Sequence, residues 1–383
     1  MYASVSRRLA VSLSLTLSLS LAAGAVTVEE PCAPATRASG WHAPVVVAGD
    51  RIATLDEAAG AAARVYFVGE SHERYDHHLN QLEIVCRLLA QGRRVAIGME
   101  MFQRPFQPAL DDFIAGRIDL DTLLLRSEYF DRWRYDPRLY APILEFARDH
   151  AIPVIALNVD AALLRTVAGG GLEALEAPER ARLPGMLPVE PAAYRERLRA
   201  IYDRHPAGPD RTFERFLASQ VLWDETMADT AARFLAANPG SVLVVFAGNG
   251  HIAWGDGIPA RVARRIGAPA IAVVNDTPGR GAEPASGDYV LLSAPLALEA
   301  PGLLGLFLDE GEDGLTVAKT SEGGAAEAAG IVAGERIEQV AGRAVRRFAE
   351  VKAALWRAPP GTPVALLVRG TDGAQRAVEL ALR

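Results

Sequence analysis

The sequence is poor in lysine, in cysteine and in positive charge overall. Lysine occurs only as Lys319 and Lys352, so nearly all of the positive charge is arginine. The formal net charge of −7 argues against nucleic acid or an anionic membrane surface as the main partner. An arginine-, alanine- and glycine-rich composition usually reflects genomic base composition. We therefore do not interpret the scattered arginines as a phosphate-binding device.

The N-terminal apolar run is too short to cross a membrane. Residues 9–23 follow Arg7 and Arg8 and mix leucine with serine and threonine, and they fall short of the roughly 20 residues that a bilayer requires. Ala23-Gly24-Ala25 then matches a small-x-small cleavage signal. We predict a signal peptide over residues 1–25, a tail over residues 26–42, and a protein that is exported to the periplasm or cell envelope and is not transmembrane.

The sequence contains two cysteines, Cys32 and Cys86. Cys32 follows Glu29-Glu30-Pro31, which does not fit a lipid-attachment signal, so we do not expect a lipoprotein. Export permits a disulfide. However, Cys86 lies in an amphipathic helical pattern, where a buried free thiol is the default. The sequence therefore favours a free thiol over a Cys32–Cys86 bridge.

Residues 43–295 show short apolar strands that alternate with helices. The helices include residues 77–91 and 258–266 and a long, mostly helical insertion over residues 161–237. Strands are predicted over residues 64–68, 94–99, 152–157, 241–247, 270–275 and 289–292. Near-continuous apolar strands separated by helices predict an α/β fold with a mainly parallel sheet covered by helices on both faces.

Polar side chains follow four of these strands. Glu70 and His72 follow the first, and because they are two residues apart they share one side of the backbone. The complete set is Glu70, His72, Glu100, Asn158, Asp160, Asn249 and His251. The carboxyl ends of parallel strands meet at one edge of a sheet, which is where ligands bind in such folds. The sequence therefore predicts that these residues converge in one cleft.

Several common chemistries lack their motifs. No Gly-x-Ser-x-Gly stretch is present for a serine hydrolase, and no Cys-x-x-Cys-His is present for covalent haem. Gly248-Asn249-Gly250-His251 looks like part of a dinucleotide fingerprint, but it comes late and no acidic strand end follows about 20 residues later. Its glycines instead allow a tight turn that aims His251 into the cleft.

Four blocks of the sequence resemble the ChaN-like haem-binding family. In chain order they are Gly69–His72, Gly98–Phe102, Gln220–Met227 and Ala247–His251. The resemblance implies a haem-binding domain over residues 43–295 that works in haem or iron acquisition in the bacterial envelope. An exported haem carrier typically ligates iron through Tyr or His. The cofactor-binding candidates are His72, Tyr75, Glu100, Met227 and His251, with Tyr75 as the first axial ligand to test.

The same Gly-Glu-x-His and Gly-x-Gly-His blocks also resemble the erythromycin esterase and Tiki/TraB hydrolase superfamily. That resemblance implies a peptidase- or esterase-type hydrolase with Glu70, His72, Glu100 and His251 as catalytic residues. His72, Glu100 and His251 would then bind a divalent metal such as Zn, Mn or Fe, which activates water. Without a metal, His72 would act as a general base that Glu100 orients. The residue types do not choose between haem and a catalytic metal.

The C-terminal part, residues 302–383, resembles the PDZ modules of exported bacterial proteins, and residues 296–301 form the predicted linker. The resemblance rests on Gly302–Phe307, Gly323–Ile331 and Gly334–Ile337. It implies a small β/α domain that binds an extended peptide or protein C-terminus by strand addition. The peptide-binding residues would be Leu304, Gly305, Leu306 and Phe307. A non-catalytic PDZ scaffold is a third hypothesis, and the sequence leaves a homodimer with a shared haem site open.

Overall fold

The computed structural model describes residues 40–185, 190–204, 212–278 and 286–383. The predicted signal peptide, most of the predicted tail and Cys32 lie outside these ranges. Within them, no helix combines the length and the apolar character that a membrane crossing requires.

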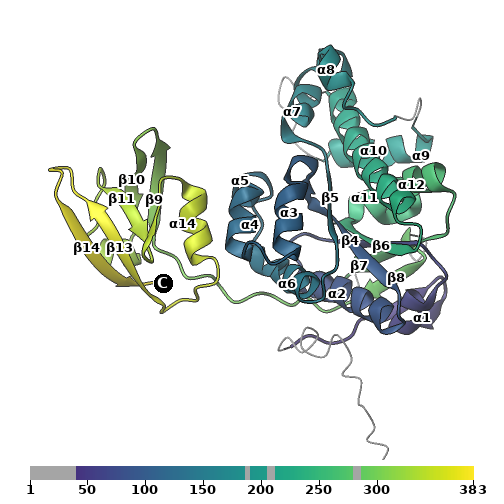
Figure 1. Cartoon of the computed structure of the whole chain (residues 1–383), viewed down its shortest axis with the longest axis horizontal. Helices are drawn as coiled ribbons and strands as arrows, with labels where there is room; N and C mark the ends of the chain where they lie inside the picture. Colours follow the sequence, from purple (N-terminus) through teal and green to yellow (C-terminus); the bar gives the residue numbers. More distant parts are fainter. Residues whose placement is uncertain (1–39, 186–189, 205–211, 279–285) are drawn as a thin grey trace, which may run out of the picture.

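The first domain is built on an eight-stranded sheet in the order β2-β1-β8-β7-β3-β6-β4-β5 (Figure 1). The strands from β8 to β5 are parallel, whereas β1 pairs antiparallel with β8 and with β2. Their bounds are β1 (Val45–Ala48), β2 (Arg51–Ala53), β3 (Val65–Glu70), β4 (Arg94–Gln103), β5 (Val154–Asn158), β6 (Ser241–Gly248), β7 (Ala270–Asp276) and β8 (Tyr289–Leu292). The predicted α/β fold with a mainly parallel sheet is confirmed.

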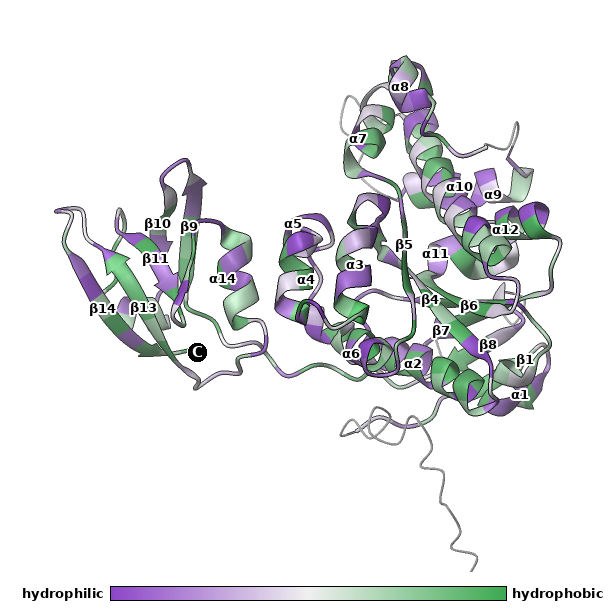
Figure 2. Ribbon diagram, in the orientation of Figure 1, coloured by the Kyte–Doolittle hydropathy of each residue, from purple (hydrophilic) through white to green (hydrophobic). Residues whose placement is uncertain are grey.

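Helices cover both faces of this sheet. They are α1 (Leu55–Gly60), α2 (Tyr75–Ala90), α3 (Gln107–Ile114), α4 (Leu120–Arg126), α5 (Tyr129–Arg132), α6 (Ala141–Asp149), α7 (Ala161–Gly170), α8 (Ala177–Arg180), α9 (Ala192–Tyr202), α10 (Phe213–Ala237), α11 (Asn249–Ile252) and α12 (Ile258–Ile266). Four short 3-10 helices are interspersed: η1 (Arg104–Phe106), η2 (Pro137–Leu139), η3 (Leu172–Ala174) and η4 (Ala253–Gly255). Figure 2 shows mostly hydrophobic strands at the centre of the sheet and mixed hydropathy on the covering helices.

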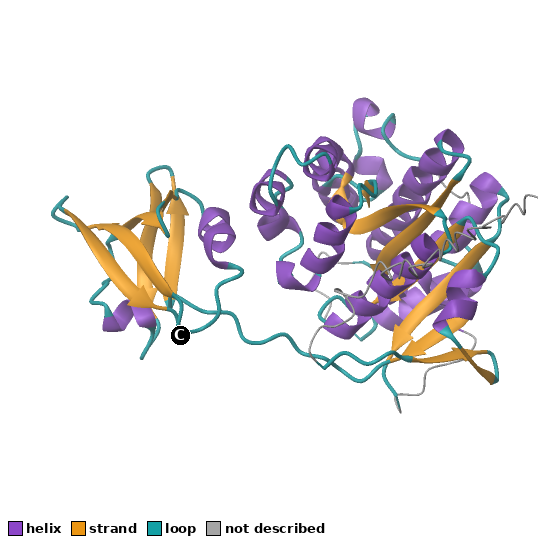
Figure 3. Cartoon of the chain, turned by 60° about the horizontal axis from the view of Figure 1, so that its bottom comes forward, coloured by secondary structure: helices purple, strands orange, loops and turns teal. Residues whose placement is uncertain are grey.

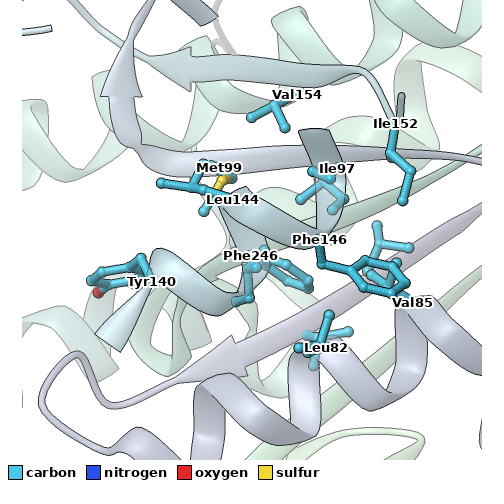
Figure 4. Close-up of a cluster of buried hydrophobic side chains, with 14 of the residues drawn as sticks. Leu82, Val85, Ile97, Met99, Tyr140, Leu144, Phe146, Ile152, Val154 and Phe246 are labelled. Atoms are coloured by element: carbon cyan, nitrogen blue, oxygen red, sulfur yellow. The ribbon is translucent and has the colours of Figure 1, made fainter. Parts of the chain in front are cut away.

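The alternation of side chains along β3 divides the core between the two faces. Tyr66 and Val68 pack in one cluster with residues of α2 and α6, and Figure 4 shows part of it around Leu82, Phe146 and Phe246. Val65 and Phe67 pack in another cluster with residues of α10 and α12. Side chains two residues apart share a face, so Glu70 continues the face of Tyr66 and Val68.

The structure corrects the expectation for Cys86, which lies buried on α2. Cys86 is disulfide-bonded, so the prediction of a free thiol is wrong. A buried position on a helix does not exclude a disulfide, because a second chain segment can lie over the helix within bonding distance.

The C-terminal domain has its own antiparallel sheet and its own apolar core. Its strands follow the order β14-β13-β11-β10-β9, with β12 paired to β11 and β9 at one edge. Figure 3 shows this sheet apart from the larger sheet of the first domain. Their bounds are β9 (Leu306–Gly311), β10 (Gly314–Thr320), β11 (Arg336–Val340), β12 (Arg343–Ala344), β13 (Pro363–Arg369) and β14 (Gln375–Ala381). Two helices, α13 (Ala325–Ala328) and α14 (Phe348–Leu355), complete it. In Figure 1, α14 faces α4 and α5 of the first domain.

Candidate functional site

The candidate site lies at the carboxyl ends of β3, β6 and β4, which are adjacent in the sheet. Glu70 is the last residue of β3 and pairs in register with Gly248, the last residue of β6. Glu100 lies inside β4, which runs four residues beyond the predicted end at Met99. His251 lies on α11, directly after β6. The four residues that the sequence singled out therefore come from neighbouring strand ends.

The carboxylate of Glu70 is fully buried and accepts hydrogen bonds on both oxygens. His72 Nδ1 lies 2.8 Å from Oε1, and the Tyr140 hydroxyl donates to the same oxygen at 2.9 Å. Gln81 Nε2 donates to Oε2 at 2.8 Å, and His78 Nδ1 lies 3.3 Å from that oxygen. Burial alone would raise the pKa of Glu70, but the charges and hydrogen bonds of His78 and His72 outweigh it and hold the pKa well below its usual value. Glu70 is thus ionised at neutral pH.

The second ring nitrogen of His72 lies on the side of Gly248 and Glu100. Because Nδ1 donates to ionised Glu70, the free position is Nε2. A Cβ placed on Gly248 would lie 3.3 Å from this Nε2, so the glycine makes room for the ring. Trp133 contacts the imidazole edge-on at a centroid distance of 4.8 Å, and Tyr135 lies 5.0 Å away. The side chain of His72 stays 26% exposed, so the ring is accessible between two aromatic walls.

His251 repeats this arrangement on the other side of the cleft. Its Nδ1 lies 2.6 Å from Oδ1 of Asp224, a buried carboxylate on α10. The Tyr194 hydroxyl donates to the other oxygen of Asp224 at 2.7 Å. His251 Nε2 lies 3.6 Å from Oε1 of Glu100. Each imidazole is therefore oriented by a buried carboxylate that a tyrosine also holds in place.

Glu100 lies between the two imidazoles. Its Oε2 accepts the backbone N–H of Gly248 at 2.7 Å, and its backbone carbonyl accepts a hydrogen bond from the Asn158 amide at 2.9 Å. Burial would lower the pKa of His251, but Asp224 and Glu100 outweigh it and raise the pKa to about 9. Burial would likewise lower the pKa of His72, and Glu70 and Glu100 together raise it. The cleft thus gathers two imidazoles and a central carboxylate at short range.

The end of β3 approaches the start of α11 closely at Gly69. A Cβ on Gly69 would lie 2.1 Å from Oδ1 of Asn249, which is shorter than any non-bonded contact. A side chain at position 69 would therefore force the Asn249 side chain to move, and with it the hydrogen bond that Asn249 Nδ2 donates to the Asn275 carbonyl at 2.7 Å.

Three predicted residues lie elsewhere. Tyr75 is the first residue of α2, half-buried, and burial raises its pKa, which works against ligation of iron as a tyrosinate. Met227 is fully buried in the core cluster that includes residues of α10 and β6. Asp160 caps α7 and pairs with Arg182 at 2.7 Å. The roles of Tyr75 and Met227 in haem binding stay predictions.

Sequence reasoning missed most residues that hold the histidines in place. They are Gln81, Tyr140, Tyr194 and Asp224, of which Asp224 lies within the block Gln220–Met227 but was given no role. One signal was visible for Asp224: it stands beside Glu225 in an apolar helical block, and charged residues on a buried helix face are rare unless paired. Tyr140 and Tyr194 carry no comparable signal, because buried tyrosines are common in cores.

The predicted metal ligands do not form a preassembled ion site. Over the residues that the structure describes, no group of three or more His, Cys, Asp or Glu side chains is arranged to hold a metal ion. Metal binding by His72, Glu100 and His251 stays a prediction.

The family model described as "Haem-binding uptake, Tiki superfamily, ChaN" matches residues 57–262, which is more than half of the chain. The chain belongs to this ChaN family of haem-binding uptake proteins. A PDZ domain model matches residues 296–369. Both resemblances that the sequence motifs indicated are thus confirmed.

Solved structures and a curated relative extend the comparison. The structure described as cofacial heme binding to ChaN of Campylobacter jejuni is 15% identical, covers 65% of this chain and 96% of that one, and has a TM-score of 0.51; this likeness concerns the fold. The peptide-bound PDZ domain of a carboxy-terminal protease from Vibrio cholerae is 23% identical and covers 21% of this chain and 93% of that one, with a TM-score of 0.19. The chloroplastic protein RETICULATA-RELATED 5 of Arabidopsis thaliana is 27% identical over 225 residues, 53% of this chain. The chain spans 30% of the length of that plant protein.

Proposed function

We propose that the ChaN-like domain binds haem in the His72–His251 cleft, and that the protein is exported and serves haem or iron handling in the bacterial envelope. The observation that carries the proposal is the paired geometry of the two imidazoles. Each binds a buried carboxylate through Nδ1, so Nε2 is the nitrogen that could bind iron; His251 Nε2 lies 3.6 Å from Glu100 and would first have to give up its proton. A carboxylate behind a histidine fixes its tautomer and makes Nε2 a better ligand for iron.

The donor set fits haem iron, with His72 as the better placed ligand. Its side chain is 26% exposed, against 13% for His251. Trp133 and Tyr135 flank its ring, and aromatic side chains of this kind can cover a porphyrin face. Haem would supply the iron-centred chemistry. The residues of this chain would orient the haem. His251 would hold or release a proton beside it.

A haemin titration of the purified protein tests the proposal. We expect a saturable Soret band. His72→Gln should weaken the affinity for haemin at least tenfold, and His251→Gln should weaken it less. Tyr75→Phe removes only the hydroxyl and asks whether the predicted tyrosine ligand is used; the raised pKa of Tyr75 argues for little effect. Arg165→Gln, at an exposed position of α7, is the matched control. A titration without saturable absorbance change would refute haem binding.

A hydrolase is the second candidate, favoured by the position of Glu100. Its carboxylate lies 3.6 Å from His251 Nε2 and accepts the N–H of Gly248, beside the His72 ring. Two oriented imidazoles and a carboxylate can activate water, with or without a divalent metal such as Zn or Mn. Stoichiometric bound metal and peptidase or esterase activity that Glu100→Gln abolishes would support it. Metal-free protein that stays inactive with added Zn or Mn would remove it.

The C-terminal domain is proposed to dock a peptide or protein C-terminus. Leu304, Gly305, Leu306 and Phe307 line a cavity beside α14, and β9 is an edge strand of the sheet, where an extended peptide can add as a further strand. A homodimer that shares haem between two protomers remains a separate prediction, which the molar mass in solution with and without haemin would test.

A further inference from the structure

The peptide groove of the PDZ domain is closed on one side by the first domain. A cavity of about 480 Å³ is lined by residues 301–308 and α14 of the PDZ domain and by Phe130 and residues 134–137 of the first domain. Phe307 and Phe348, on opposite sides of the groove, are 50% and 42% exposed. Large apolar side chains left this exposed beside a cavity are typical of a binding site.

α14 forms one wall of the groove and packs against the first domain. Residues three, four and seven apart share a helix face, and α14 uses two such faces. Facing the cavity are Phe348, Val351, Lys352 and Leu355. Packed in the core cluster of the first domain are Ala349, Ala353 and Trp356, the residue after α14, which also lines the cavity.

Polar contacts hold the same junction. Trp356 Nε1 donates to Oδ1 of Asp121 at 2.9 Å, and Arg343 pairs with Oδ2 of that residue at 2.9 Å. Arg357 pairs with Glu145 at 2.9 Å. The two domains therefore present the groove as one unit.

Three positive side chains lie at this groove, next to Asp131, whose charge acts on Lys352, and Glu310, whose carboxylate accepts the N–H of Phe348 at 2.8 Å. Both lysines of the sequence lie here: Lys352 lines the cavity, and the ammonium group of Lys319 lies 4.5 Å from the ring centroid of Phe307. Arg134 lines the cavity from the first domain. None of the three is in an ion pair with another described residue, and the one carboxylate in the lining, Asp136, pairs with Arg138 at 2.6 Å. An acidic side chain of a bound peptide would complement this charge.

One side chain borders both the groove and the histidine cleft. Tyr135 lines the peptide cavity, and its ring lies 5.0 Å from that of His72. Trp133 contacts both of these rings, at 5.4 Å and 4.8 Å. A ligand that displaces or clamps Tyr135 would change what covers His72.

We infer that the groove between the two domains binds a free C-terminus that ends in an apolar residue preceded by acidic residues, and that its occupancy alters the surroundings of His72 through Tyr135. The inference rests on the PDZ docking mode proposed above, and it does not depend on haem. Arg134 and Lys352 select the acidic residues, and the apolar groove takes the last side chain.

The specificity is tested with an array of synthetic octapeptides whose last four positions vary, presented to the whole protein with either a free or an amidated C-terminus. We expect binding only to free carboxylates, with apolar last residues and Asp or Glu enriched before them. For the best peptide, fluorescence anisotropy should show about tenfold weaker binding to Arg134→Glu and Lys352→Glu. Arg165→Glu makes the same charge change at an exposed position of α7 and should bind as the wild type. Absence of any preference for free carboxylates overturns the docking mode, and equal binding by the charge variants overturns the two-domain groove.

The coupling is tested without haem by NMR of protein labelled at the histidine Cε1 positions. The His72 signal, assigned as the one that disappears in His72→Gln, should shift when the peptide saturates the groove. In Tyr135→Ala the His72 signal should no longer respond, even at peptide concentrations that saturate the variant as measured by its own anisotropy titration. A peptide that saturates the wild-type groove and leaves the His72 signal unchanged overturns the coupling. Because neither readout uses haemin, a protein that fails the Soret titration can still pass both tests.

Discussion

The two imidazole–carboxylate pairs of the cleft look alike but are assembled differently. Glu70 and His72 are two residues apart on one strand end, whereas Asp224 and His251 are 27 residues apart and come from α10 and α11. The first pair is local, and its histidine is the more exposed. The second is formed by tertiary packing and is more enclosed. An imidazole–carboxylate pair can therefore be recognised from the sequence when its two residues are close together in the chain, and is missed when they are far apart.

The Glu70 carboxylate and the two imidazoles respond to pH in opposite directions, because the pKa of Glu70 is lowered whereas the pKa values of His72 and His251 are raised. The pKa of Glu70 is lower in the folded protein than its usual value, so its stabilising contribution is present at neutral pH and is lost as the pH falls. The pKa of His251 is raised to about 9, so its contribution is lost as the pH rises. Each of the following predictions tests a difference between the two pairs.

The largest expected effect comes from removing the carboxylate of the local pair. Glu70→Ala leaves His72, His78, Tyr140 and Gln81 without their shared acceptor in a buried site. Breaking a buried ionic network in this way costs about 3–5 kcal/mol of unfolding free energy. Urea denaturation measures the loss, and Glu73→Ala, at an exposed position three residues later, should change stability little. A loss for Glu70→Ala no larger than that for Glu73→Ala would contradict the account.

The pH dependence of stability tests the more enclosed pair. His251 has a pKa of about 9 when folded, against 6.5 for an unperturbed histidine. Its contribution, about 3 kcal/mol, should be fully present below about pH 6.5 and should fade as the pH rises through about 9. Unfolding free energies of the wild type and His251→Gln, measured across this window, should converge at the alkaline end. Parallel curves would show that His251 does not bind its proton more tightly in the folded state.

A milder substitution changes the partner of His251 and leaves the histidine in place. Asp224→Asn keeps the size of the side chain but removes the charge that, with Glu100, outweighs burial. The pKa of His251 should fall from about 9 toward or below 6.5, which an NMR titration measures, while His72 should respond less. Asp256→Asn removes a neighbouring carboxylate that pairs with Arg197 instead and serves as control. If both variants shifted the pKa of His251 equally, a general field effect rather than the pair would be responsible.

The smallest expected effect concerns the glycine between the pairs. A Cβ at Gly248 would lie 3.1 Å from Cε1 of His72, so the ring must give by a few tenths of an ångström, whereas a Cβ at Gly250 meets nothing within 4 Å. Gly248→Ala should cost about 1 kcal/mol, at the low end for overpacking a core, yet shift the NMR signal of His72. Gly250→Ala should leave that signal in place. Identical spectra for the two variants would mean that His72 does not pack against β6.

The sequence predicted the parallel sheet and one half of the site well, for physical reasons. Fully buried strands appear in the sequence as continuous apolar runs. The strand predicted over residues 241–247 spans Ser241–Gly248 in the structure. Alternation along a strand placed Glu70 and His72 on one side. In contrast, Asp224 lies in the middle of a helix, and its pairing with His251 depends on how α10 packs against α11. Periodicity carries no information about that packing.

Other errors were avoidable or had a local cause. The hairpin of β1 and β2 was not predicted, although Gly49-Asp50 is a typical two-residue turn and Gly49 has a φ of +58°. The free thiol expected at Cys86 was wrong, because a helix pattern does not reveal which segment lies over it. Asp160 was expected in the cleft, but it caps α7 instead; a carboxylate directly before a helix often takes that role.

The absorption spectrum and metal content of the purified protein decide between haem binding and metal-dependent hydrolysis. The account predicts a Soret band and iron that rise together to a fixed ratio per chain when haemin is supplied, and that both decline in His72→Gln. Colourless protein that carries stoichiometric Zn or Mn and shows no saturable response to haemin would contradict it, and would assign the same two imidazoles and Glu100 to hydrolysis.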